Sequence, residues 1–391
     1  MRKGQMRSGK MLAGRMLAAT LLVMTLGNAA ADPQFAPLEA TVRAAMAKTG
    51  ARGLAIAVVE RGRPVFIRSY GARNAAGAPL DRDTIMYGAS ITKAVFAYTV
   101  MQLVDEGKID LDRPLATYLA KPLPDYGNLD AYGNWGDLAG DDRWQRITAR
   151  MVLTHSTGFA NFSFLEPDGK LKFHFDPGTR YGYSGEGMMM LQFVIEQGLG
   201  LDLGAEMQRR VFDRFGMTNT SLIWRADFAR NLADGWKIDG SVEPHDERSR
   251  VRAAGSMDTT IDDIAKFAAG FMRGDGVSAA RRAEMIGPHL PITTRSQFPS
   301  LQPEAPTTER VVGLAAGLSV ITFNGPQGTG FFKGGHNDST ANMWVCLKRS
   351  ARCVIILSND VRAEREFPTL VRAALGETGM PWGWEYGLPA K

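Results

Sequence analysis

The sequence predicts an α/β fold in which one antiparallel sheet is formed by the N- and C-terminal segments of the chain and a large helical region is inserted between them. Strand-like runs occur at both ends, within residues 53–71 and again from 313 to 359. Helical patterns and long loops dominate between about residues 90 and 290. The 391 residues are 45% hydrophobic and 22% charged, which suits a large core in one domain or two closely joined domains.

The first element of the chain is typical of a secretory signal peptide. Basic residues mark its start, the apolar run Met16–Leu26 follows, and small residues stand at Ala29 and Ala31. This order predicts that residues 1–31 are cleaved and that residues 32–391 form the mature protein, periplasmic or secreted. The apolar run falls short of the roughly 20 residues that a membrane span needs, so we expect no stable membrane anchor after cleavage.

This leader accounts for the net charge. The whole chain has a formal charge of +5, but residues 1–31 contain five basic residues and no acidic one. The mature chain therefore carries 41 basic and 41 acidic residues. Because nucleic-acid binding requires a clustered basic face, we expect no nucleic-acid partner.

The elements of the mature chain follow from periodicity and turn signals. A helix is predicted over 36–49, and two strands flank a turn at Arg61–Gly62. A second helix begins at Ser90 and runs towards residue 107, and a core helix lies within residues 175–197. The later runs are strands within 313–323, 328–335, 341–348 and 353–359 and a final helix over roughly 361–375.

Cys346 and Cys353 flank a predicted hairpin whose turn lies at Arg349–Ser350. In an exported protein this pair could form a cross-strand disulfide. Two small buried side chains on neighbouring strands would explain the same spacing. A two-residue loop would put the cysteines in a hydrogen-bonded pair, whose Cα atoms lie further apart, so the spacing favours neither interpretation.

Two long loops are candidates for ligand binding. Residues 124–144 are rich in Gly, Asp and Asn, and residues 291–310 are rich in Pro and Thr. Ordered loops of this length are often binding loops or lids. The acid spacing of 124–144 does not match a calcium-binding EF-hand, which favours a solvated loop there. We expect the functional site in the cleft between the sheet and the helices.

Several common catalytic patterns are absent from the sequence. There is no G-x-S-x-G nucleophile elbow, no H-E-x-x-H zinc pair, no Walker A motif and no G-x-G-x-x-G. The five histidines are scattered without the spacing of metal ligands. No metal site is therefore predicted.

Ser90 and Lys93 could instead form a nucleophile and its base. At positions i and i+3 of a helix they share one face, and the N-terminal end of the helix dipole lies near the serine oxygen. Apolar neighbours disfavour the charged form of the lysine and lower its pKa, so that it can act as a base. Such a pair can activate a serine without a histidine.

Two further segments carry candidate partners. In DPGTRYGYSG, Tyr183 beside two lysines would be drawn towards phenolate, or would be a core ring with a hydrogen-bonded hydroxyl. In GFFKGGHN, Lys333 ends an apolar strand and is followed by Gly334 and Gly335, which allow the backbone to approach a ligand closely. Lys333 could equally be an edge-strand lysine that discourages aggregation.

Together these segments resemble the serine β-lactamase and penicillin-binding protein superfamily, in particular the class C β-lactamases and the carboxylesterases that share their fold. Ser90–Lys93 matches the Ser-x-x-Lys motif, Tyr183–Gly185 the Tyr-x-Asn position and Lys333–Gly335 the Lys-Thr-Gly motif. The segment 153–159, LTHSTGF, resembles a further family segment of scaffold type. The resemblance covers about residues 36–376 in the expected order.

The resemblance implies a β-lactamase-like sandwich and a two-step acyl transfer without any cofactor. Ser90 would attack a carbonyl group, with Lys93 and Tyr183 sharing the proton transfers as one coupled unit. The backbone N–H groups of Ser90 and His336 would form the oxyanion hole. Lys333 would tune the site electrostatically and contact a substrate carboxylate.

Two departures from the family pattern concern the substrate. Gly185 replaces the asparagine that meets the amide side chain of a β-lactam, and Gly334, before Gly335, replaces the threonine that helps hold its carboxylate. Loss of such groups weakens discrimination in favour of substrates that use them. We therefore expect an exported serine hydrolase of small-acyl carboxylic esters, with weak β-lactam hydrolysis beside it.

The retained Lys333 keeps alternatives open. One is a class C-like β-lactamase, or a D-amino-acid peptidase or D-Ala-D-Ala carboxypeptidase acting on cell-wall peptides. Another is a non-catalytic protein that binds penicillin or peptidoglycan, although the intact reactive side chains argue against it. The expected partner is thus a small ester, β-lactam or D-peptide, and the sequence makes no prediction of the oligomeric state.

Overall fold

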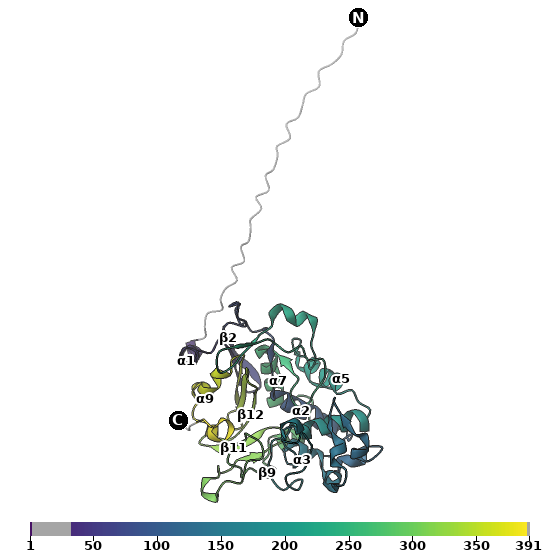
Figure 1. The fold of residues 1–391 in the computed structure, drawn as a ribbon. Coiled ribbons are helices and arrows are strands. Elements are labelled where there is room, and N and C mark those ends of the chain that lie inside the picture. The colour runs from purple at the N-terminus through teal and green to yellow at the C-terminus, as the bar shows by residue number, and fades with distance from the viewer. Residues whose placement is uncertain (2–32, 389–391) are drawn as a thin grey trace. The chain divides into compact units, whose positions relative to one another are not determined.

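The computed structural model describes Met1 and residues 33–388, so the predicted signal peptide lies, apart from Met1, outside the described residues. Its central element is one eight-stranded sheet in the order β2-β1-β14-β13-β12-β11-β10-β9, with every neighbouring pair antiparallel (Figure 1). The strands are β1 (Gly53–Glu60), β2 (Arg63–Gly71), β9 (Leu290–Pro291), β10 (Ala315–Ala316), β11 (Ile321–Gly325), β12 (Gly328–His336), β13 (Ala341–Leu347) and β14 (Arg352–Ser358).

The segment between β2 and β9 consists mainly of helices and loops, so the predicted antiparallel sheet with a helical insertion is confirmed. It also contains three two-stranded pairs, β3 (Met86–Tyr87) with β8 (Asp258–Thr259), β4 (Asn128–Leu129) with β5 (Gly133–Asn134), and β6 (Gly235–Trp236) with β7 (Val242–Glu243). The α-helices are α1 (Ala36–Thr49), α2 (Ile91–Asp105), α3 (Ala149–Leu153), α4 (Gly185–Phe193), α5 (Leu203–Met207), α6 (Asp213–Phe215), α7 (Ile261–Arg273), α8 (Ala279–Met285), α9 (Phe367–Leu375) and α10 (Trp382–Tyr386).

The central strands are buried on both faces, which explains their continuous apolar sequence. Successive side chains of a strand point to opposite faces. Ala55 and Ala57 of β1 belong to the large hydrophobic cluster that also contains residues of α2 and α7. Ile56 and Val58 are equally buried and point to the other face, where α9 packs on β14 (Figure 1).

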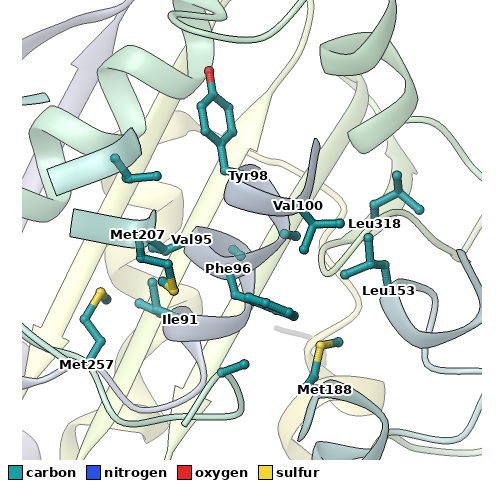
Figure 2. Packing of buried hydrophobic residues seen from close by; sticks show 14 of the residues in the cluster. Ile91, Val95, Phe96, Tyr98, Val100, Leu153, Met188, Met207, Met257 and Leu318 are labelled. Carbon is teal, nitrogen blue, oxygen red and sulfur yellow. The ribbon is translucent and has the colours of Figure 1, made fainter. Parts of the chain in front are cut away.

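Helix α2 is buried all round. Every residue from Ile91 to Val104 is buried. The Phe96 ring points towards Leu153 and Met188 (Figure 2). A helix in this position is stabilised by apolar contacts on every side. The side chain of Lys93, within this buried span, is therefore placed in a hydrocarbon environment, whereas Asp105 at the end of α2 is exposed.

The structure corrects two sequence predictions and adds one helix. The run 313–323 forms two short strands, because residues 317–320 turn between them with Ser319 at φ 61°. The last predicted helix begins as a 3-10 helix over Val361–Glu366 before α9. Helix α10 follows it and was not predicted from the sequence.

No helix within residues 33–388 is long and apolar enough to cross a membrane.

Cys346 and Cys353 form a disulfide between β13 and β14. The strands end at Leu347 and resume at Arg352, so four residues connect them, and the cysteines lie directly opposite each other. Their Cα atoms are 4.1 Å apart, close to the spacing of a non-hydrogen-bonded pair. The expected hydrogen-bonded pair with a longer separation was therefore wrong.

Removal of this disulfide is expected to lower the free energy of unfolding by about 2 kcal/mol, because the bond restrains a short loop in the unfolded chain. Urea unfolding of the wild type with and without reductant measures the effect. The Cys346→Ala/Cys353→Ala variant also loses two buried sulfur atoms and should not respond to reductant. An unchanged unfolding midpoint of fully reduced wild type would contradict the prediction.

Candidate active site

Ser90 stands at the N-cap of α2, directly after Ala89, whose φ of 46° is unusual for a residue with a side chain. This turn starts the helix at the end of the short strand β3. Lys93 lies one turn along α2, and its Nζ is 3.0 Å from Ser90 Oγ. The same Nζ donates to the carbonyl oxygen of Ala254. The predicted pair is thus in direct contact, with the amine held from a second side.

Lys93 is 1% exposed, which disfavours its charged form. Burial holds the pKa of Lys93 well below its ordinary value, and the positive charge of Lys333 lowers the pKa further. A neutral amine beside a hydroxyl can accept its proton. The two residues therefore meet the geometric and electrostatic requirements of a nucleophile with its base.

Tyr183 is the third group at this point. Its hydroxyl is hydrogen-bonded with the Ser90 side chain and lies 3.5 Å from Lys333 Nζ. Of the two interpretations of Tyr183, the structure favours the buried ring with a hydrogen-bonded hydroxyl over the phenolate: burial raises the pKa of Tyr183 strongly, and this outweighs the opposing effect of the hydrogen bond to Ser90. The lysines do not compensate, because burial lowers the pKa of both. Tyr183 is a neutral phenol that can donate a proton.

His155, from the LTHSTGF segment, supports Tyr183. Its ring lies against the Tyr183 ring with centroids 4.4 Å apart, and its Nδ1 accepts the backbone N–H of Ser184 at 3.2 Å. Its carbonyl oxygen accepts the N–H of Gly182 at 2.7 Å. Burial lowers the pKa of His155 well below its usual value. A neutral histidine thus fixes the segment that positions Tyr183.

Lys333 lies on β12, beside the start of α2. Burial lowers the pKa of Lys333 to about 8, and its Nζ donates to the Gly334 carbonyl at 2.6 Å. A Cβ atom on Gly335 would lie 2.9 Å from the backbone nitrogens of both Ser90 and Ile91. Only a glycine lets β12 run this close to Ser90.

The register of β12 orients the N–H of His336. Asn337 N–H donates to Thr340 O at 3.0 Å across the β12–β13 ladder. Hydrogen-bonded and non-hydrogen-bonded pairs alternate, so the N–H of the neighbouring His336 faces away from β13. The pairing of β11 with β12 ends at Phe332, which leaves that side of β12 facing the start of α2. This arrangement fits two N–H donors, from Ser90 and His336, around one oxyanion.

A cavity of about 710 Å³ contains the predicted site between the sheet and the helical region. The loop 291–310 contributes Gln297 and Phe298 to its wall, whereas the loop 124–144 contributes no lining residue. Most residues of that second loop are partly or fully exposed, as expected for a solvated loop, while Trp135, Leu138 and Trp144 anchor it in the core. The disulfide lies outside the cavity lining. The predicted residues that line the cavity together are Ser90, Lys93, Tyr183, Lys333, Gly334, Gly335 and His336.

Sequence reasoning missed several residues of the wall. Asn161, Phe162, the charged segment 246–250 and Glu385 all line the cavity. None belongs to a recurring short motif, and each comes from a segment far from Ser90 in sequence. The one signal in the sequence for Glu385 was an acidic residue surrounded by aromatic residues in WGWEYG.

Two of these residues explain the glycines that depart from the family pattern. A Cβ atom on Gly185 would lie 2.3 Å from Phe162 Cζ, so the aromatic ring fills the space of an asparagine side chain. A Cβ atom on Gly334 would lie 2.3 Å from Glu385 Oε1 and 2.6 Å from the Tyr386 hydroxyl. Both substrate-binding side chains of the lactamase pattern are thus replaced by other protein groups.

Comparisons with known proteins agree with this fold. A lovastatin esterase of Penicillium rubens is 26% identical over 225 residues, which are 50% of this chain and 56% of the esterase. The chain therefore matches little more than half of that relative. The D-alanine carboxypeptidase AmpC from Burkholderia cenocepacia superposes with a TM-score of 0.68 at 17% identity, covering 88% of this chain and 98% of its own. A class C beta-lactamase gives 0.68 at 15% identity, covering 88% and 95%.

The family pattern described as Beta-lactamase matches residues 38–377, from α1 to beyond α9. The family and the esterase relative indicate a serine hydrolase of the β-lactamase fold. The matched range includes every predicted site residue and the whole antiparallel sheet. The chain belongs to the beta-lactamase family of serine hydrolases.

Proposed function

We propose that this chain hydrolyses small-acyl carboxylic esters through an acyl-enzyme on Ser90, with weak β-lactam hydrolysis beside it. The observation that carries the chemistry is the buried Lys93 Nζ at 3.0 Å from Ser90 Oγ. The neutral Tyr183 hydroxyl is hydrogen-bonded with the Ser90 side chain as well. The similarity to a lovastatin esterase supports an ester substrate.

Residues of the site can accept and donate every proton that the reaction moves, so the proposed reaction needs no cofactor. Ser90 Oγ attacks the ester carbonyl while its proton passes to Lys93, and the N–H groups of Ser90 and His336 hold the oxyanion. The C–O bond to the alcohol breaks, and the alcohol leaves with a proton from the Tyr183 hydroxyl, which the Lys93 proton then replaces. Water repeats these steps in reverse, releasing the acid and restoring Ser90.

The two filled glycine positions support esters over β-lactams. The Phe162 ring fills the space that an asparagine side chain occupies in the β-lactamase pattern, and Glu385 and Tyr386 fill the space beside Gly334. A site that cannot hydrogen-bond the amide side chain or the carboxylate of a β-lactam gains little from those groups. The buried Lys333 is the feature that favours the second candidate, a class C-like β-lactamase or D-Ala-D-Ala carboxypeptidase.

We further propose that residues 1–31 direct export and are removed, which makes the protein periplasmic or secreted. The disulfide between Cys346 and Cys353 supports this location, because disulfides persist in oxidising compartments.

Side-by-side assays of p-nitrophenyl butyrate, a cephalosporin and a D-Ala-D-Ala peptide test the proposed substrate. We expect kcat/KM for the ester to exceed that for the other two by roughly 10²-fold or more. Faster turnover of the peptide would replace the esterase by the carboxypeptidase. A stable penicillin adduct on Ser90 in intact-mass spectra, without ester turnover, would indicate a binding protein.

A further inference from the structure

Glu385 places a buried carboxyl group on the wall of the cavity that contains Ser90. The residue is 3% exposed and lies on α10, next to Lys333 and Gly334 in the cavity lining. Its Oε1 would be only 2.3 Å from a Cβ atom on Gly334. The carboxyl group therefore occupies the space that a side chain following Lys333 would otherwise fill.

Two buried polar side chains hold this carboxyl group in place. Gln297 Nε2 donates to Glu385 Oε2 at 2.6 Å, and the Tyr181 hydroxyl donates to Gln297 Oε1 at 2.6 Å. Because Oε1 of Gln297 accepts from Tyr181, its amide presents the NH₂ group to Glu385. If Glu385 moved away, a buried donor would be left unpaired, which is unfavourable.

Lys333 is the cation that acts most strongly on Glu385. Burial raises the pKa of Glu385 to about 7, while Lys333 and then His336 oppose the rise, and the charge of Glu364 adds to it. Between the pKa of Glu385 and that of Lys333 the carboxylate and the charged lysine coexist, so the charge of Lys333 is already balanced by a protein group. A substrate carboxylate arriving beside Lys333 would meet a like charge in a poorly solvated place.

We propose that Glu385 is a specificity-determining residue whose carboxylate excludes substrates that bring a negative charge beside Lys333 and reserves the site for uncharged esters. The inference rests on the proposed ester hydrolysis at Ser90 and names the substrate class of that site. It explains why a family-type lysine is retained next to a glycine: a protein carboxylate in the same cavity wall, and not a substrate carboxylate, supplies the negative charge near Lys333.

Two matched ester pairs test the proposal at about pH 7.5, between the pKa values of Glu385 and Lys333. One pair carries the charge on the acyl side, p-nitrophenyl butyrate and mono-p-nitrophenyl glutarate. The other carries it on the leaving side, methyl 3-acetoxybenzoate and 3-acetoxybenzoate. In the wild type the charged member should be the poorer substrate of each pair. Glu385→Gln should raise the ratio of kcat/KM, charged to neutral, by at least about fivefold in one pair or both.

The ratio is the measured quantity, so a general loss of activity in the variant cancels. Glu385→Ala provides the same charge removal should the glutamine variant fold poorly. Glu364→Gln is the matched control, because Glu364 contacts His336 Nδ1 at 3.4 Å but does not line the cavity. This control should leave both ratios within about twofold.

A smaller change than fivefold in both pairs would overturn the proposal, and so would an equal change in Glu364→Gln, which would indicate a net-charge effect. Ser90→Ala separates the two levels of inference. If it abolishes hydrolysis of the neutral esters while Glu385→Gln leaves both ratios unchanged, the proposed function stands and the role of Glu385 falls. If neutral esters are hydrolysed without Ser90, the proposed function itself is wrong.

Discussion

Replacing Ser90 with alanine is expected to lower kcat/KM for p-nitrophenyl butyrate by roughly 10⁴-fold or more, because the nucleophile is lost. Replacing Lys93 with methionine keeps the length of the side chain without a base and should cost roughly 10²–10⁴-fold. Both residues act on one proton, so the double variant should be no slower than Ser90→Ala alone. Initial rates of the four proteins measure this cycle.

The pH profile of kcat/KM tests the protonation state of Lys93. The amine must be neutral to accept the Ser90 proton, and burial with the charge of Lys333 holds its pKa well below the ordinary value. The rate should therefore rise as the pH rises through this lowered pKa and be level at mildly alkaline pH. Lys93→Arg should stay inactive across the range, because a guanidinium group does not lose its proton there.

Lys348 provides a matched control for Lys93. Burial lowers the pKa of Lys348 too, but this lysine donates to the Ile286 carbonyl and does not line the cavity. Lys348→Met should keep its activity. If Lys93→Met kept more than about a tenth of the wild-type rate, or if its loss simply multiplied with that of Ser90→Ala, Lys93 would not be the base.

The parts of the fold that could be predicted are those whose signal is local. β1 and β14 are continuous apolar runs bounded by turn residues, and both appear in the sheet near the expected bounds. Ser90 begins α2 as expected. The break between β10 and β11 was missed because its cause, the positive φ of Ser319, leaves no mark in an apolar run.

The parts of the site that could not be predicted depend on contacts between distant segments. Tyr183 stands beside two lysines in the motif pattern, but its protonation follows from complete burial. Glu385 and Phe162 belong to no motif, and only the folded chain brings them against Gly334 and Gly185. Motif spacing thus predicted candidate reacting groups that line one cavity, whereas the other residues of the cavity wall could be identified only from tertiary packing.

Replacing Gly335 with alanine is expected to lower kcat by roughly 10²–10³-fold, because it disturbs the proposed oxyanion hole. The new Cβ atom would lie 2.9 Å from the backbone nitrogens of Ser90 and Ile91 and 3.1 Å from the Gly88 carbonyl oxygen. These neighbours are backbone atoms, so relief requires β12 or the start of α2 to move. Either movement displaces the N–H of Ser90 from that of His336.

Gly255→Ala is the matched control for this loss. A Cβ atom there would lie 3.4 Å from the Tyr87 hydroxyl and 3.6 Å from the Ala89 carbonyl oxygen. These are ordinary van der Waals distances, and Ala89 directly precedes Ser90, so the substitution also lies beside the start of α2. This variant should keep most of its activity. Circular dichroism and thermal melting of both variants show whether the fold survives. Even a shift of a few tenths of an ångström in either N–H donor weakens a preorganised oxyanion hole. A folded Gly335→Ala protein with an unchanged kcat would therefore mean that the close approach of β12 to α2 does not form the oxyanion hole.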